Sequence, residues 1–584
     1  MNLDTIVDTI KNEEELEEAI AIIRTESIIA LDTETTKTPT WKGRRLMGVS
    51  IWAPQANRGW YLPVGHNLSL FAKNFELPVF ERIWDFVKYK SIVFHNAKFD
   101  LQVLYRAGFE DYPGAVSDTM IASWIFNENE SHSLKDLGVK YVDPMANVRE
   151  QELKKLEKSV GWDNIPAELM GRYAVKDVEL TWKLWEHYLP MLHEERELAA
   201  AYQKRIEFLR VLMGIELRGV LIDRVQARQF AASAAKHMTQ IQEELGIDPA
   251  KPSQLARKLF GPPPLGEGLL PLSYSAAVSK SFPNGRPDTS EAALKTYRNG
   301  VCGRVLEYRS YAKAKSTYYD AWVESLGEDG RLHPSYNQHG TRTGRLSCSG
   351  PNMQQIPRDM ETTPVKSLLR ATKGYDLWEF DYSQVELRLA AVYAQEPRML
   401  QNFIDGADVH QSVAETLGVT RFLGKTINFL ILYGGGSGKL AAVSGLTERE
   451  AKRILENYHS TYPGFRSISQ EAEFTMRARG FVRLWSGRRR NLEHDWEAHK
   501  AFNGIIQGGA ADIMVETMCR LDKADLPVNL VGQVHDSLWV EIPANPIANR
   551  DSLINQIKEI MEWPGTEFPI PFPVDSKCLY RSPE

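Results

Sequence analysis

The sequence predicts a multidomain protein that combines α/β and α+β parts, and three observations lead to this fold class. The chain has 584 residues, which is too long for one hydrophobic core and corresponds to about three or four domains. Strand-like and helix-like segments alternate over residues 1–190, and a long charged helical stretch follows from about 192 to 250. From residue 331 onward, strands and helices mix.

The composition is ordinary for a globular protein and argues against several classes. Hydrophobic residues make up 43% of the chain, charged residues 25%, and the net charge is −6, so only a local basic surface could serve nucleic acid. The four cysteines form no Cys-x-x-Cys pair, which argues against a zinc ribbon or a disulfide framework and favours a reducing compartment. The N-terminus is acidic and no apolar run approaches about 18 residues, so we expect a cytoplasmic protein without a membrane span.

The expected elements follow the chain in order. A helix-like EEELEEAIAIIRTE precedes the strand SIIALDTETT, and the strand in SIVFHNAKFD leads into a second helix. Residues 261–290 are rich in Pro, Gly and Ser, which predicts an exposed, mobile tip, and helices resume at 290–326. The segment 408–520 reads mainly as helix, and LVGQVHDSLWVEI at 530–542 predicts two short strands joined by a tight turn.

Four acidic residues and one tyrosine in the first 180 residues suggest a metal site. Asp32 and Glu34 alternate on a strand and therefore share a face, while Tyr173 and Asp177 share a helical face at i, i+4; Asp100 ends the segment HNAKFD. Each fragment alone also fits a solvated acidic edge. If the four carboxylates converge, however, they repel one another unless cations neutralise them. Two divalent metals would do so and would activate a water against a phosphodiester.

A stripe of cations and aromatics lies in RFLGKTINFLILYGGG. Arg421, Lys425, Phe429 and Tyr433 recur every four residues, so a helix carries them on one face until Gly434–Gly436 end it. The order suits a nucleoside triphosphate, with cations on the phosphates and aromatic faces near the base. An amphipathic helix with core aromatics and solvated cations is the competing explanation.

Two further aspartates sit at strand ends. Asp381 follows the alternating Trp378 and Phe380, so it is expected on a strand, with a helix after it. Asp536 lies at the tip of the 530–542 hairpin, where Asp is also a common turn residue. A buried carboxylate without a partner is costly, and two magnesium ions about 4 Å apart, clamped by both aspartates on adjacent strands, would remove that cost.

Three fragments could contact a duplex. The loop TRTGRLSCSGPNMQQIPR carries Arg342, Arg345 and Arg358 among amides and glycines, as expected of a loop that touches a phosphate backbone, although a plain surface loop would look the same. Asn503 and Gln507 share a helical face, and such amides can reach minor-groove acceptors. FVRLWSGRRRN at 481–491 adds a basic cluster.

These motifs resemble two known families. DTE…NAKFD…YAVKD is similar to the three motifs of the DEDD exonuclease superfamily in its tyrosine subclass, as are SDTMIASW and HSLKDLGVKY between them. TGRLS…PNMQQIPR, DYSQVELR, RxxxKxxNFxxxYG, QGGAADI and QVHD resemble family A DNA polymerases, the bacterial DNA polymerase I lineage and its phage relatives; KPSQLARKLF and PDTSEAALKTY resemble the thumb of that family.

The resemblance implies a fold, a set of domains and a function. It implies a ribonuclease H-like exonuclease domain at 1–191 and a right-hand polymerase with thumb 192–330, palm 331–400 and 526–584, and fingers 401–525. It implies a template-directed DNA polymerase that extends a primer with dNTPs and proofreads from 3′ to 5′, in DNA replication of a phage genome and in the host cytoplasm. Expected partners are primer–template DNA and dNTPs, with a helicase–primase and a single-strand-binding protein as further candidates, for a monomer.

The resemblance also assigns roles residue by residue. It implies Mg²⁺ as cofactor, two ions per active site, with Mn²⁺ able to replace it. The implied ligands are Asp32, Glu34, Asp100 and Asp177 in the exonuclease, where Tyr173 orients the water, and Asp381, Asp536 and the Tyr382 carbonyl in the polymerase. The implied nucleotide-binding residues are Arg421, Lys425, Phe429 and Tyr433, with Glu386 excluding ribonucleotides. The implied primer–template contacts are Arg342, Arg345, Asn503, Gln507 and His535.

The sequence departs from the family at one site residue. The hairpin usually reads His-Asp-Glu, and here Ser537 takes the place of the Glu. We interpret that second acid as a marginal ligand. Because the exonuclease motifs begin at residue 32, we expect no 5′-nuclease domain, and because the thumb at 192–330 is short, we expect no large processivity-factor insertion and no thioredoxin-type subunit. The alternatives are an exonuclease whose C-terminal half only holds nucleic acid, a non-catalytic scaffold, and a single-subunit RNA polymerase, against which Glu386 argues.

Overall fold

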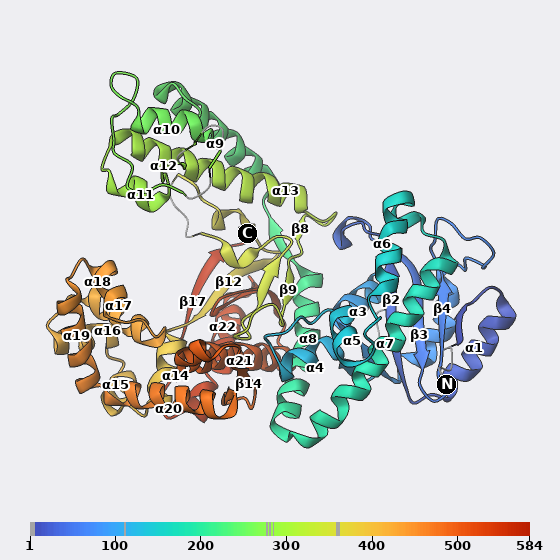
Figure 1. Cartoon of the computed structure of the whole chain (residues 1–584). Coiled ribbons are helices and arrows are strands. Elements are labelled where there is room, and N and C mark those ends of the chain that lie inside the picture. Colours follow the sequence, from blue (N-terminus) through green and yellow to red (C-terminus); the bar gives the residue numbers. More distant parts are fainter. Residues whose placement is uncertain are drawn as a thin grey trace. The chain divides into compact units, whose positions relative to one another are not determined.

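The computed structural model describes residues 6–109, 112–275, 278–279, 282–283, 285–357 and 362–583. The chain forms two compact units, coloured along the sequence in Figure 1. Unit 1 comprises the chain up to Arg218 together with Ser335–Cys348 and Glu379–Lys577. Unit 2 comprises Gly219–Pro334, Ser349–Trp378 and the chain from Cys578 onward. Within the described ranges, no helix is long and apolar enough to cross a membrane.

The N-terminal part of unit 1 is built on a six-stranded mixed sheet in the order β1-β4-β3-β2-β5-β6. β2 pairs antiparallel with β3 and parallel with β5, so it is a central strand. Its apolar run Ile29–Leu31 is fully buried, as expected of a central strand that is covered on both faces. The strands are β1 Ile6–Thr9, β2 Ile28–Thr35, β3 Leu46–Ala53, β4 Arg58–Pro63, β5 Ser91–Phe94 and β6 Val116–Asp118.

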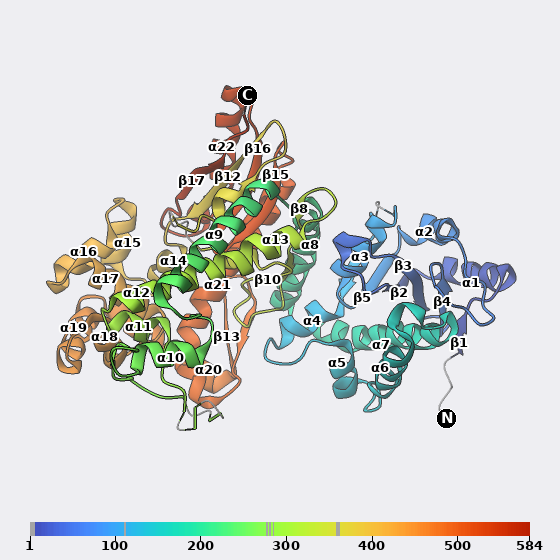
Figure 2. The same ribbon diagram turned by 90° about the horizontal axis from the view of Figure 1, so that it is seen from above.

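Helices cover this sheet, and α7 (Ala167–Glu194) packs against β1 to β4 (Figures 1 and 2). Local sequence explains where the helices begin: the side chain of Asn12 accepts from the Glu15 N–H at the start of α1, and that of Asp118 accepts from two N–H groups at the start of α4. The remaining helices, with α8 leading out of this part, are α1 Glu13–Thr25, α2 Glu81–Val87, α3 Ala97–Arg106, α4 Thr119–Phe126, α5 Leu134–Tyr141, α6 Val148–Val160 and α8 Arg196–Arg218.

The C-terminal part of unit 1 surrounds the helix α21 (Ala501–Lys523), which packs against α20 and β13 (Figure 2). Most of α21 is buried all round, as expected of a helix in the middle of a domain. The other helices here are α14 Val385–Tyr393, α15 Pro397–Ile404, α16 Val409–Leu417, α17 Arg421–Leu432, α18 Ser437–Ser444, α19 Glu448–Thr461, α20 Pro463–Arg479, α22 Ile547–Met561 and α23 Pro564–Glu567.

A four-stranded sheet in the order β15-β16-β12-β17 carries the two C-terminal aspartates. Its strands are β12 Tyr375–Tyr382, β15 Asn529–Val534, β16 Ser537–Pro543 and β17 Val574–Tyr580; the boundary between the units runs through β12 and β17. Two small hairpins complete this part, formed by β9 Ser335–Asn337 with β10 Ser347–Ser349 and by β13 Phe481–Arg483 with β14 Arg489–Asn491.

Unit 2 is a helical layer with a small antiparallel sheet in the order β11-β7-β8. α9 packs against α12 and against the π-helical segment Ala314–Asp320 that continues α12. Its elements are β7 Val220–Ile222, α9 Arg224–Leu245, α10 Pro252–Phe260, α11 Glu291–Thr296, α12 Gly300–Lys313, α13 Ala321–Ser325, β8 Arg331–Leu332 and β11 Leu369–Arg370.

The structure confirms the expected elements around the candidate sites. The hairpin is present, with a two-residue turn of His535 and Asp536, and His535 has φ 54°. Ser537 is not in that turn: it is the first residue of β16 and pairs with Val534. The domain boundaries stay a prediction, and α8, which they assign to the thumb, lies in unit 1.

Candidate functional site

The four N-terminal carboxylates lie around the end of β2. Asp32 and Glu34 are on β2, Asp100 is on α3 and Asp177 on α7. The Asp100 Oδ1 accepts from both the Thr33 N–H (2.9 Å) and the Thr33 hydroxyl (2.7 Å), which ties α3 to the residue between Asp32 and Glu34. The structure therefore brings three separate sequence motifs to one place.

Electrostatics show that these carboxylates interact. Burial, followed by the charge of Asp177, raises the pKa of Asp32 to about 7. Burial and the charges of Asp32 and Asp177 raise the pKa of Glu34, and burial and Asp32 raise that of Asp100. The pKa of Asp177 is also raised by burial, against the opposing effects of the Lys135 ammonium and the Tyr173 hydroxyl. Such clustered acids favour cations.

Sequence analysis missed Lys135, a cation inside this cluster. Its Nζ on α5 contacts the Asp177 Oδ1 and lies 4.6 Å from the centre of the Tyr173 ring, and its side chain is only 12% exposed. Lys135 opposes the raised pKa of Asp32, Glu34 and Asp177. The only sequence signal was its place in HSLKDLGVKY, because Lys135 and Asp177 are 42 residues apart.

The acidic cluster fits divalent cations in its chemistry, because carboxylate oxygens are ligands that such ions prefer. Among the described residues, no three His, Cys, Asp or Glu side chains already stand as a metal-binding group. The Lys135 ammonium occupies one carboxylate oxygen instead. Four carboxylates against one lysine still leave an excess of negative charge, which favours divalent ions.

The C-terminal aspartates lie on neighbouring strands. Asp381 is on β12, Asp536 is at the β15–β16 turn, and the Tyr382 N–H donates to the Asp536 carbonyl (3.1 Å). Burial raises the pKa of Asp536, while Arg345 and His535 lower it. The Tyr382 side chain points into the core, where its hydroxyl lies 2.7 Å from the Thr517 hydroxyl, so only its carbonyl could assist at the site. Two adjacent carboxylates and a carbonyl suit Mg²⁺.

Ser537 lies beside these aspartates but bonds elsewhere. Its buried hydroxyl donates to the Val534 carbonyl (2.9 Å) and lies 3.5 Å from the Glu379 Oε1. Glu379 also accepts from the Trp539 indole N–H (3.2 Å), and it shares a strand face with Asp381. A third carboxylate, which the sequence did not single out, is therefore present next to the position of the missing family Glu.

A hydrogen-bonded chain crosses the site from the 341–345 loop to α17. Arg345 forms an ion pair with Glu386 on α14, and the Tyr433 hydroxyl donates to the other Glu386 oxygen (3.0 Å). Burial raises the pKa of Glu386, Arg345 lowers it and Asp536 raises it. Arg345 thus acts on both Glu386 and Asp536.

The stripe on α17 is present and accessible. The Phe429 and Tyr433 rings stack at 6.2 Å between centroids, and the Lys425 Nζ lies 6.0 Å from the Phe429 centroid. Arg421 and Lys425 are exposed, and Arg421 pairs with the exposed Asp408 (2.6 Å). An exposed ion pair is worth about 0–1 kcal/mol, so a phosphate can replace Asp408 at little cost. The structure therefore argues against a stripe of core aromatics.

The expected duplex contacts have mixed surroundings. Asn503 and Gln507 are the two positions of residues 501–511 that are not buried, although the Asn503 amide donates to the Leu432 carbonyl (3.1 Å). Arg342 is exposed and pairs with Glu493. Arg358 lies outside the described residues.

The interpretation of residues 481–491 as a basic cluster for nucleic acid is wrong for its described arginines. Arg488 is buried against Asp512, Arg489 pairs with Glu195, and Arg490 pairs with Glu128. The sequence could not reveal this, because the acidic partners come from distant parts of the chain.

Comparisons with known proteins agree with this geometry. Residues 224–579 match the family model described as DNA polymerase family A, and residues 7–193 match that described as 3′-5′ exonuclease. The chain therefore belongs to DNA polymerase family A and carries a 3′-5′ exonuclease domain ahead of the polymerase domain, as its motifs predict.

Similar proteins and a similar fold are known from bacteria. DNA polymerase I of Chloroflexus aurantiacus is 30% identical over 94% of this chain and 61% of its own length, and that of Pseudomonas aeruginosa is 30% identical over 91% and 60%. The chain thus spans about 60% of the length of these relatives. A solved structure, the POL domain of Pol1 from M. smegmatis in complex with DNA primer-template and dNTP, has TM-score 0.79 at 22% identity and covers 98% of both chains, which shows the shared fold.

Proposed function

We propose that this chain is a template-directed DNA polymerase that extends a primer 3′ end with dNTPs and removes mispaired ends with its 3′-5′ exonuclease. The observation that carries the proposal is the placement of Asp381 beside Asp536, where the N–H of the next residue, Tyr382, donates to the Asp536 carbonyl. The Arg345–Glu386–Tyr433 chain lies next to them. Family membership, and the bound primer-template and dNTP of the M. smegmatis protein, support it.

In synthesis, the roles follow from the chemistry of each side chain. Asp381, Asp536 and the Tyr382 carbonyl would hold two Mg²⁺ or Mn²⁺ ions, which when bound assist attack of the primer 3′-hydroxyl and departure of pyrophosphate. Arg421 and Lys425 bind the triphosphate through charge-assisted hydrogen bonds. Phe429, further along the same helix, would lie near the sugar, and Tyr433, at the C-terminal end of the helix, would lie near the template–primer terminus.

Selection and duplex contact fall to neighbouring residues. Glu386, held by Arg345 and Tyr433, blocks the space of a ribose 2′-hydroxyl. Asn503 and Gln507 contact minor-groove acceptors, which are nearly alike for all base pairs. Arg345, His535 and the exposed Arg342 contact the primer–template, the last through phosphate.

In editing, the N-terminal cluster hydrolyses the terminal phosphodiester. Asp32, Glu34, Asp100 and Asp177 would hold two divalent ions, which when bound activate the attacking water. The Tyr173 hydroxyl orients that water from its position beside Asp177. A mispaired end frays more easily and so reaches this site as a single strand.

Primer extension from a mismatched 3′ end, with dNTPs and Mg²⁺, tests the proposal. The wild type should trim the mismatch and then extend; Asp32→Ala should fail to trim, and Asp536→Ala should trim without extending. Trimming by the wild type without any extension would favour the second candidate, an exonuclease whose C-terminal half only holds nucleic acid.

Other expectations stay predictions. They are service to a phage genome, a cytoplasmic location, a monomeric state and contact with a helicase–primase or a single-strand-binding protein. The relatives reported above are bacterial, and they give the phage assignment no support.

A further inference from the structure

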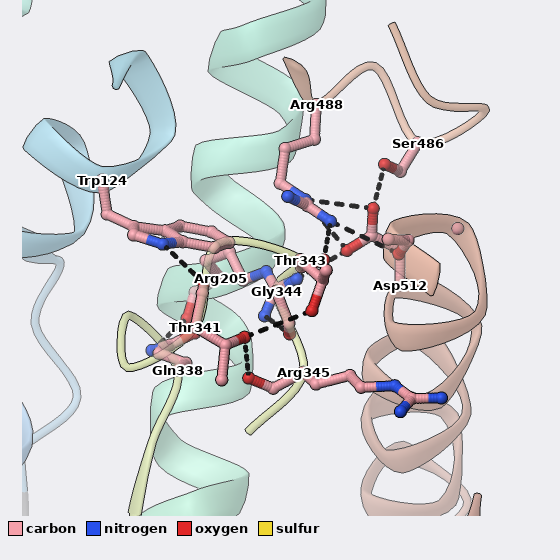
Figure 3. Close-up of polar contacts among 12 residues, drawn as sticks. Trp124, Arg205, Gln338, Thr341, Thr343, Gly344, Arg345, Ser486, Arg488 and Asp512 are labelled. Carbon is pink, nitrogen blue, oxygen red and sulfur yellow. Dashed lines mark hydrogen bonds and ion pairs between the residues drawn. The ribbon is translucent and has the colours of Figure 1, made fainter. Parts of the chain in front are cut away.

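The loop of residues 341–345 has a backbone that is held from several sides. The Trp124 indole N–H donates to the Thr341 carbonyl (3.3 Å), and the Thr341 hydroxyl donates to the Arg345 carbonyl (2.6 Å). Figure 3 shows Arg345 reaching away from these contacts, with its carbonyl at the Thr341 hydroxyl. The backbone of Arg345 is thus fixed independently of its side chain.

Behind the loop lies a buried cluster with one carboxylate and two guanidinium groups. Asp512 on α21 accepts from Arg205 on α8 (2.5 Å) and from Arg488 in the β13–β14 turn (3.2 Å), and Ser486 also donates to it (2.5 Å) (Figure 3). Arg205 and Arg488 are each 2% exposed, and both guanidinium groups lie about 5 Å from the Trp124 ring.

The two guanidinium groups carry one more charge than the Asp512 carboxylate can neutralise. Carbonyl groups of the loop accept hydrogen bonds from the N–H donors that Asp512 does not reach. Burial lowers the pKa of Arg205 to about 10, against the effect of Asp512, so the group stays protonated at neutral pH. The surplus donors are satisfied by loop carbonyls: Arg488 donates to the Thr343 carbonyl (2.7 Å) and Arg205 to the Gly344 carbonyl (3.5 Å). Buried N–H donors need hydrogen-bond partners. The two guanidinium groups therefore favour the loop conformation that presents the Thr343 and Gly344 carbonyls to them.

Two glycines admit the guanidinium groups. Gly344 has φ +87°, and a Cβ there would lie 2.6 Å from the Arg488 Nη2. On α21, a Cβ at Gly508 would lie 2.9 Å from the same Nη2 and 2.5 Å from a Leu484 methyl. These glycines belong to the motifs TGRLS and QGGAADI, so part of each motif serves packing around the cluster rather than substrate contact.

We propose that the Arg205–Asp512–Arg488 cluster, with Trp124 of the exonuclease domain, positions the 341–345 loop so that Arg345 can bind the primer terminus in the polymerase site. The inference rests on the proposed function. Trp124, Arg205, Arg488 and Asp512 are positioning residues, since they act through Arg345. The exonuclease domain thereby contributes to primer binding at the polymerase site indirectly, through the position of Arg345.

Two variants that leave Arg205, Arg488 and Asp512 themselves unchanged test this. Thr341→Val removes the hydroxyl that holds the Arg345 carbonyl, and Trp124→Phe removes the indole N–H that holds the Thr341 carbonyl. Each loses one hydrogen bond, so we expect the Kd for a primer–template with 2-aminopurine at the primer end to rise about three- to tenfold. Thr461→Val is the matched control, because it also removes a half-exposed hydroxyl that donates to a carbonyl (Asn457, 2.9 Å), far along the chain in α19.

A double-mutant cycle separates positioning from general stability. Thr341→Val should weaken DNA binding in the wild type but change the Kd less than twofold in an Arg345→Ala background, because the residue through which it acts is gone. Equal losses in both backgrounds, or a Kd within twofold of wild type for both single variants, would overturn the positioning role while wild-type extension still upholds the proposed function. A wild type that neither binds nor extends a primer would overturn both.

Discussion

Replacing Gly344 by alanine should cost far more stability than the same change at Gly108. Both glycines have left-handed backbone, with φ +87° and +95°, so both substitutions carry about 1–2 kcal/mol of conformational strain. At Gly108 the new methyl group would meet nothing within 4 Å. At Gly344 it would lie 2.6 Å from the Arg488 Nη2, 2.9 Å from its Cζ and 3.1 Å from the Arg205 Nη2.

The additional cost at Gly344 follows from the bonds that must shift. Arg488 cannot keep its place, and a charge-assisted hydrogen bond of the kind it makes to the Thr343 carbonyl contributes about 1.5–3 kcal/mol. We therefore expect Gly344→Ala to lower the free energy of unfolding by about 2.5–5 kcal/mol and Gly108→Ala by about 1–2 kcal/mol.

Urea unfolding followed by circular dichroism measures both values, from midpoint shifts at a common slope. Primer–template binding should weaken in Gly344→Ala and remain unchanged in Gly108→Ala. Equal losses of stability in the two variants would refute the reasoning, because they would mean that the arginines yield to the methyl group at no cost.

Three further outcomes are expected. Ser537→Glu should change the rate of primer extension by less than about tenfold, or roughly 1.4 kcal/mol, because two aspartates and a carbonyl already supply ligands; a thousandfold gain would contradict this. Lys135→Met removes the ammonium at Asp177, so its melting temperature should fall more in EDTA than in excess Mg²⁺, and equal falls would show that no cation substitutes for the lysine. Burial lowers the pKa of His95 to about 3, so its contribution to stability is complete above about pH 6.5 and is lost as pH falls toward 3. Between pH 7 and 5 this amounts to about 2 kcal/mol, and His95→Gln should have a shallower pH slope by that amount.

Local patterns predicted the elements that carry the candidate sites. The four-residue spacing from Arg421 to Tyr433 specifies a helix, and the alternation around Asp381 specifies a strand, because both periods are properties of adjacent residues. The convergence of Asp32, Glu34, Asp100 and Asp177 could be predicted from a physical argument about cations. Four clustered carboxylates repel one another, and bound cations remove that repulsion.

Long-range pairing explains what the sequence did not reveal. Arg205 and Asp512 are 307 residues apart, and no periodicity links them. The run Arg488–Arg490 looks like a solvated basic surface until the fold brings Asp512, Glu195 and Glu128 to it. Composition gives the number of charges but not their partners.

The place of Trp124 limits how freely this chain can be divided into its two domains. Deleting the exonuclease domain would also remove the indole that lies against two guanidinium groups and the hydrogen bond that holds the Thr341 carbonyl. The Arg205 and Arg488 guanidinium groups would then lose the ring that covers them, and the 341–345 loop would lose one of its hydrogen bonds. A shortened chain would therefore need a replacement side chain against Arg205 and Arg488 to keep the 341–345 loop in its place.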